Sequence, residues 1–120
     1  MTGWEVKFTD EFKEWLKQQS DNDKVVIAGR MFLLQEYGPN LARPYADTLK
    51  GSKIRNLKEL RAKTDTHVFR IAFLFDEGQR AVILIGGDKK GKDEKRFYKN
   101  LINQAEQIYK QYIGKKGDGG

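Results

Sequence analysis

The sequence predicts one α+β domain with a twisted antiparallel β-sheet, a helical hairpin and a C-terminal helix, in the order β-α-α-β-β-β-α. Apolar residues recur at helical spacing in three segments, and other segments alternate as strands do. Turn-forming clusters separate the later strands by only a few residues, as in β-hairpins. A length of 120 residues suits one domain, expected to span residues 1–113, with a frayed tail over 114–120.

The first half of the chain is expected to form one strand and two helices. Residues from Trp4 to Phe8 alternate like a short strand. Thr9 then begins a helix with acids in its first turn, and the polar run 18–23 ends it. A second helix is expected from about Asp23 to Tyr37, where a Gly-Pro-Asn sequence stops it. The stretch 41–52 reads as a loop.

The second half is expected to form an antiparallel meander and a last helix. The expected strands are Ile54–Lys63, Val68–Asp76 and Gln79–Gly86, and the helix runs from about Asp93 to Ile113. A glycine-rich basic loop, from Gly86 to Lys92, precedes this helix. We expect the helices to cover one face of the sheet.

Composition limits the chemistry. There is no cysteine and only one histidine, His67, which argues against a thiolate or histidine metal site and predicts no cofactor. The net charge is +6, and residues 43–70 carry eight basic and three acidic side chains, a net of +5. No apolar run could span a membrane and the first residues do not resemble a signal peptide, so a cytoplasmic protein is expected.

Strand alternation singles out one arginine. In the strand beginning at Val68, the large apolar residues Phe69, Ile71 and Phe73 share the expected core face, and Arg70 then points to the other face. Arg61 lies on the preceding strand, but the sequence does not fix the register that would place it beside Arg70. An ordinary exposed face, with Arg61 paired to Glu59 or Asp76, explains the pattern equally well.

Three further features are weaker candidates. The basic loop could approach a phosphate closely, or be a solvated turn. Tyr98 is expected to lie beside that loop, with Phe97 in the core, although Tyr98 could equally be a second packing aromatic. His67 is expected in a hairpin turn, where a lone histidine is more often incidental than catalytic.

Four segments together resemble a known family. They are Leu57-Lys58-Glu59-Leu60-Arg61, Val68-Phe69-Arg70-Ile71-Ala72-Phe73, Gly86-Gly87-Asp88-Lys89-Lys90-Gly91 and Glu94-Lys95-Arg96-Phe97-Tyr98-Lys99. From Trp4 to about Tyr112 the chain resembles the RelE/ParE toxin superfamily, in its HigB-like, phage-derived branch. The resemblance implies the toxin of a type II toxin–antitoxin pair that cuts messenger RNA in the ribosome without metal. It also implies attack by the ribose 2′-hydroxyl, leaving a cyclic phosphate and a free 5′-hydroxyl.

The resemblance also suggests roles for residues. Arg70 and Arg61 match basic residues that hold the phosphate, Lys89 or Lys90 matches a basic position after the last strand, and Tyr98 matches a tyrosine placed against a base. Glu59 stands where RelE has a lysine. Glu59, a lysine of lowered pKa and a Tyr98 phenolate are all candidates for the general base. The expected RNA-binding residues are Lys53, Arg55, Lys58, Lys63, Lys90, Lys92, Lys95 and Arg96.

Two other functions remain open from the sequence. A ParE-like protein would bind DNA gyrase and cut no RNA, and a non-enzymatic module would need only the basic surface. The expected partners are the ribosome, messenger RNA and a helix-turn-helix antitoxin of the HigA type with an acidic surface. That antitoxin could dock between the hairpin and the last helix, or against the N-terminal helices.

Overall fold

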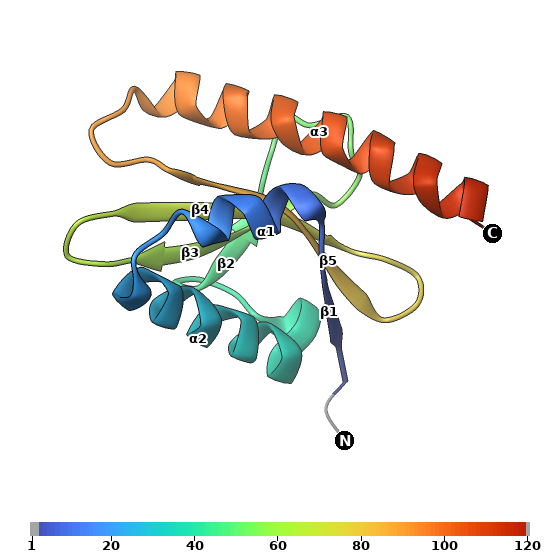
Figure 1. Ribbon diagram of the computed structural model, residues 1–120, viewed down its shortest axis with the longest axis horizontal. Coiled ribbons are helices and arrows are strands. Elements are labelled where there is room, and N and C mark those ends of the chain that lie inside the picture. Colours follow the sequence, from blue (N-terminus) through green and yellow to red (C-terminus); the bar gives the residue numbers. More distant parts are fainter. Residues whose placement is uncertain (1–2, 120) are drawn as a thin grey trace.

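The structure is a computed structural model and describes residues 3–119, with side chains as far as Lys115. The observed order adds one strand to the predicted order (Figure 1). The elements are β1 (Glu5–Phe8), α1 (Asp10–Lys17), α2 (Asp21–Tyr37), the short 3-10 helix η1 (Gly38–Asn40), β2 (Ala46–Thr48), β3 (Lys58–Lys63), β4 (Val68–Phe75), β5 (Arg80–Asp88) and α3 (Glu94–Gly119).

The five strands form one sheet in the order β1-β5-β4-β3-β2. The predicted antiparallel hairpins β3/β4 and β4/β5 are confirmed. β1, however, pairs with β5 in parallel, so the sheet is not antiparallel throughout. A four-residue strand carries no sequence signal for its partner, and the prediction missed this long-range pairing.

Helices cover both faces of the sheet, and the expectation of a single covered face was wrong. Figure 1 shows α3 on one side of the sheet and α1 and α2 on the other. Phe69, Ile71 and Phe73 of β4 pack with the core under α1 and α2, whereas Ala72 and Leu74 pack with the core under α3. β4 is apolar on both sides, as a strand buried on both faces must be.

Two adjacent glycines allow the helices to approach the sheet. We expected the third strand of the meander to end at Gly86 and Gly87 to lie in the loop, but β5 continues through both glycines to Asp88. A Cβ at Gly86 would lie 2.6 Å from the indole ring of Trp15, and a Cβ at Gly87 would lie 3.1 Å from the ring of Phe97. Because successive residues face opposite sides of a strand, the pair makes room for one aromatic ring on each face.

Several predicted boundaries change. β2 lies in the stretch 41–52 that we expected to be a loop, and the strand expected from Ile54 begins only at Lys58. β2 has three residues and pairs with Lys58–Leu60. A strand of three residues is too short for an alternation of apolar and polar residues to be recognised in the sequence. Residues 54–57 instead form a loop whose apolar side chains pack under α3.

The last helix is longer than expected. It continues through Gly114, where we expected it to end, and reaches Gly119. Most of the predicted tail is therefore helical, and Gly120 lies outside the described residues. In the part of the chain that the structure describes, no helix is long and apolar enough to cross a membrane.

Candidate active site

The two arginines singled out from the sequence lie side by side. Arg61 is the cross-strand partner of Arg70 in the β3/β4 hairpin, so both side chains leave the same face of the sheet. Glu59 pairs with Ala72 and shares that face. The first turns of α3 cover this face and bring Tyr98 against Glu59.

The Tyr98 hydroxyl connects Glu59 to Arg70. It donates to Glu59 Oε1 over 2.8 Å and accepts from Arg70 Nε over 3.0 Å. Arg61 Nη1 donates to the other carboxylate oxygen, Glu59 Oε2, over 2.8 Å, and Arg70 Nε lies 3.7 Å from Oε1. One carboxylate therefore fixes two guanidinium groups and a phenol, in a network we call the Glu59 network. Hydrogen bonds that involve charged groups are the strongest available for this purpose.

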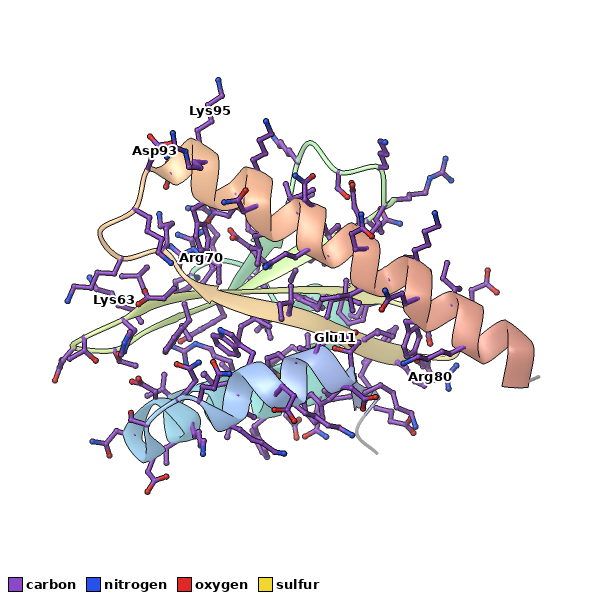
Figure 2. The ribbon with its side chains drawn as sticks, turned by 45° about the horizontal axis from the view of Figure 1, so that its top comes forward. Glu11, Lys63, Arg70, Arg80, Asp93 and Lys95 are labelled. Carbon is purple, nitrogen blue, oxygen red and sulfur yellow. The ribbon has the colours of Figure 1, made fainter. Side chains whose placement is uncertain are left out.

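Arg70 is buried, contrary to the expectation that it lies on an open face. Its side chain is 7% exposed, and it also donates to the Phe69 carbonyl oxygen over 2.9 Å. Figure 2 shows Arg70 between the sheet and the start of α3. The error follows from the second helical layer, which turns the expected solvent face into a core. Arg61, whose side chain is 22% exposed, is the more accessible arginine.

Tyr98 is held as a neutral phenol. Burial raises its pKa above the usual value, and the hydrogen bond and negative charge of Glu59 raise it further, while Arg70 acts in the opposite direction. The Tyr98 phenolate was one of three candidates for the general base, and the raised pKa disfavours it. Burial and the Glu59 carboxylate together outweigh Arg70, so the phenol keeps its proton and donates it to Glu59 in a hydrogen bond.

A pocket of about 550 Å³ opens over the Glu59 network. Four of the five catalytic candidates from the sequence line it, namely Glu59, Arg61, Lys89 and Tyr98, whereas Arg70 lines the neighbouring groove. Lys89 Nζ lies 2.6 Å from Glu94 Oε1 and 5.9 Å from the centre of the Tyr98 ring. The hydrogen bond from Lys89, together with its charge, lowers the pKa of the Glu94 carboxyl.

Six lining residues were missed from the sequence, and five of them lie around β2. Arg43, Asp47 and Lys50 reach the pocket from the segment around β2, and Arg43 Nε lies 2.7 Å from Asp47 Oδ2. The sequence does not show where a basic residue in an expected loop lies in the folded protein. The i,i+4 spacing of Arg43 and Asp47 was the available clue, but it reveals a pair and not its location.

The predicted RNA-binding residues do not gather in one place. Lys63 lines a groove beside the pocket, Lys53 and Arg55 line a groove against the middle of α3, and Lys92 and Arg96 line another near β5. Lys90 and Lys95 are exposed, with Lys95 pointing away from the sheet (Figure 2). Lys58 pairs with Phe73 and therefore faces the core under α1 and α2.

The single histidine has a structural setting. His67 stacks on Phe69 with ring centres 5.2 Å apart, and its Nδ1 lies 2.8 Å from Oδ2 of the buried Asp23 in α2. It thereby connects the hairpin turn to α2 and does not line the pocket over the Glu59 network. Among residues 3–115, whose side chains the structure describes, no three His, Cys, Asp or Glu side chains form a group that could hold a metal ion.

The chain matches a family model over most of its length. The model is described as "Phage derived protein Gp49-like" and covers residues 14–110, which include every residue of the Glu59 network. The chain belongs to the Gp49-like family. The predicted recognition of a phage-derived, HigB-like relative of RelE is thus supported at the level of the family, and two other comparisons agree with it.

The relatives include two proteins of Mycobacterium tuberculosis (strain ATCC 25618 / H37Rv). "Putative toxin HigB3" is 34% identical over 110 residues, which are 92% of this chain and 94% of the relative. "Putative toxin HigB2" is 28% identical over 117 residues, 97% of this chain but 57% of that longer relative. A chain from the crystal structure of the archaeal RelE-RelB complex from Pyrococcus horikoshii OT3 matches with a TM-score of 0.55 at 17% identity, over 75% of this Gp49-like chain and 99% of its own length. These matches confirm the predicted RelE-like fold and HigB-like membership.

Proposed function

We propose that this Gp49-like protein is the toxin of a type II toxin–antitoxin pair, and that it cuts messenger RNA on the ribosome without a metal ion. The Glu59 network carries the proposal: Glu59, Arg61 and Tyr98 line one pocket together with Lys89, and Arg70, which is bonded to Tyr98, lines the adjoining groove. Such a set supplies a base and fixed positive charge, the two requirements for breaking a phosphodiester with side chains alone. The HigB names of its relatives support the toxin assignment.

The proposed reaction is an internal transfer within the RNA. The ribose 2′-hydroxyl attacks the adjacent phosphorus, and its proton passes to Glu59. Arg61 and Arg70 stabilise the negative charge on the pentavalent phosphorus, for which the planar guanidinium is well suited. The bond to the 5′-oxygen breaks, and the leaving oxygen takes a proton from Lys89. The products are a 2′,3′-cyclic phosphate and a free 5′-hydroxyl.

Glu59 is our choice of general base. The raised pKa of Tyr98 keeps that phenol protonated, which removes it as a base. The other acids of the pocket, Asp47 and Glu94, form their ion pairs with Arg43 and Lys89, whereas Glu59 forms its ion pairs with the two arginines that would hold the phosphate. The side chain of Glu59 is 4% exposed, so the ribose hydroxyl must take the place of one of the two hydrogen bonds that Glu59 accepts. Tyr98 then orients Glu59 and Arg70 and offers its ring to the substrate.

The proposed partners follow from the charge of the chain. The net charge of +6 suits messenger RNA and the ribosome. An antitoxin of the HigA-like helix-turn-helix type, with an acidic surface, would neutralise the +5 block at residues 43–70, which has eight basic and three acidic side chains. The proposed cleavage of messenger RNA would take place in the cytoplasm, where ribosomes are found.

The direct test uses purified protein with ribosomes programmed by a defined messenger RNA. Cleavage by the wild-type protein, together with growth arrest that a co-expressed antitoxin relieves, is the expected result. A parallel DNA gyrase assay separates the ParE-like alternative. Growth arrest with gyrase inhibition and intact messenger RNA would replace the proposed function by gyrase poisoning, and unimpaired growth with abundant folded protein would reject a toxin.

A further inference from the structure

A second groove continues from the active site around the edge of the sheet. β2 pairs with β3 only as far as Leu60, and beyond that point the Tyr45 carbonyl accepts from the Arg61 backbone N–H over 2.7 Å. From there to the end of β3 at Lys63, no strand among residues 3–119 pairs with this edge. The resulting groove, of about 550 Å³, shares Arg43 and Arg61 with the active-site pocket. We call it the edge groove.

The edge groove is lined by five cations and no acid. The cationic side chains are Arg30, Arg43, Arg61, Lys63 and Arg70. Arg43, Arg61 and Arg70 each have a carboxylate partner, but no acid among residues 3–115, whose side chains the structure describes, forms an ion pair with Arg30 or Lys63. Five cations against the two carboxylates of Asp47 and Glu59 leave an excess of positive charge in the groove, which favours an anionic ligand.

Arg30 is held in place before any ligand arrives. Its Nε donates to the Arg61 carbonyl oxygen over 2.9 Å, across from α2 to the edge of β3. This bond uses one of the five N–H donors of a guanidinium group. The side chain is thus oriented by the fold, so a phosphate that binds it costs little further loss of side-chain freedom.

An aromatic ring lies beside these cations. Tyr45 is 37% exposed, and the guanidinium carbon of Arg30 lies 5.0 Å from the centre of its ring. A ring with an open side and neighbouring cations is the arrangement by which proteins hold single-stranded nucleic acid, stacking a base and neutralising its phosphate. An acidic peptide would use the cations but would gain little from the ring.

We propose that the edge groove binds a nucleotide of single-stranded RNA next to the scissile phosphate. The base stacks on Tyr45, and the phosphate contacts Arg30 and Lys63. This assignment rests on the proposed function, because the groove matters to catalysis only if the adjoining pocket cuts RNA. It adds Arg30 and Tyr45 as substrate-binding residues and gives Lys63 a defined role. Figure 2 shows Lys63 on the hairpin beyond Arg70, toward the turn.

The test measures the affinity of the full chain for a short single-stranded RNA with 2′-O-methyl sugars, which cannot be cut because the attacking hydroxyl is blocked. Tyr45→Leu should weaken binding by roughly tenfold, the scale of one lost base stack, while Tyr45→Phe should keep it. Lys63→Gln should lower the salt dependence of binding by about one phosphate contact. Lys13→Gln, at an exposed lysine of α1 that lines neither the edge groove nor the active-site pocket, is the matched control and should change neither the affinity nor its salt dependence.

A second probe lacking its bases isolates the stacking contribution. Tyr45→Leu and the wild-type protein should bind this probe with equal affinity, because it has no base to stack on the ring. Equal affinity of Tyr45→Leu and wild type for the complete RNA, or no measurable wild-type binding at low salt, would overturn the proposal. So would variants that keep RNA affinity but lose the antitoxin, because the groove would then be a protein interface.

The two proposals fail in different ways. If the wild-type protein cuts RNA but Tyr45→Leu binds and cuts normally, the edge groove is refuted and the proposed function stands. If the binding results come out as expected but no RNA is ever cut, the edge groove stands as an RNA site and the proposed reaction is refuted.

Discussion

Replacing Arg61 by alanine separates catalysis from folding better than replacing Arg70. Both arginines contact the Glu59 network, but the side chain of Arg61 is 22% exposed and that of Arg70 only 7%. Arg61→Ala removes one hydrogen bond to a carboxylate, which costs about 1.5–3 kcal/mol of stability, toward the lower end for a group partly open to water. Arg70→Ala removes a partner from a buried charge pair, a change that costs about 3–5 kcal/mol.

The expected effect of Arg61→Ala on the reaction is much larger than on folding. Loss of one donor that stabilises charge in the transition state lowers the rate roughly 100- to 1000-fold. Cleavage of ribosome-bound messenger RNA, measured under single-turnover conditions with saturating protein, reports this rate. Urea unfolding of the same sample shows whether the fold survives.

Arg80 provides the matched control. It forms an ion pair of 2.9 Å with Asp76 at 28% side-chain exposure, close to the exposure of Arg61 (Figure 2). Arg80→Ala should lower stability by an amount similar to Arg61→Ala and leave cleavage unchanged. A folded Arg61→Ala protein that cuts at the wild-type rate would remove Arg61 from the proposed mechanism.

Three further predictions concern packing, pH and the partner. Gly86→Ala should lower the free energy of unfolding in urea by about 1–3 kcal/mol, because the new Cβ would lie 2.6 Å from an indole ring. Gly29→Ala, in α2 with open space around it, should raise the free energy of unfolding by about 0.5–1 kcal/mol. The raised pKa of Tyr98 means that the folded state holds the phenol proton more tightly than the unfolded state does. The free energy of unfolding should therefore keep this contribution below about pH 10 and lose it as the pH rises through the raised pKa. Unfolding curves of Tyr98→Phe should not show this loss. Charge reversal at Lys53 and Arg55, which line the groove against α3, should weaken a purified antitoxin complex in titration calorimetry; an unchanged affinity would contradict electrostatic docking there.

Local patterns in the sequence predicted the elements well and their assembly less well. Alternation in β4 correctly assigned Phe69, Ile71 and Phe73 to one core. It could not show that Ala72, on the other face, is also buried, because a small residue fits solvent and core equally. The second helical layer therefore remained hidden, and Arg70 was placed on an open face.

The sequence proposed those residues of the candidate site that stand out within their own strand or helix. Arg61, Arg70 and Tyr98 were candidates from the sequence, and the register then brought the two arginines together. Arg30 and Tyr45 were not candidates from the sequence, because one lies on a helix and the other in a segment expected to be a loop. Only long-range packing brings the two side chains together at the edge of β3.

The central claim is that the Glu59 network makes a ribose 2′-hydroxyl attack the adjacent phosphorus. The most direct measurement is cleavage of a ribosome-bound messenger RNA that carries a single 2′-deoxyribose on the 5′ side of the mapped cut. We predict that this one missing oxygen abolishes cleavage there, and that the normal RNA yields a 2′,3′-cyclic phosphate and a free 5′-hydroxyl. Cleavage of the deoxy-substituted RNA at the same position, or products with a 5′-phosphate, would show that water attacks instead and would contradict the proposed chemistry.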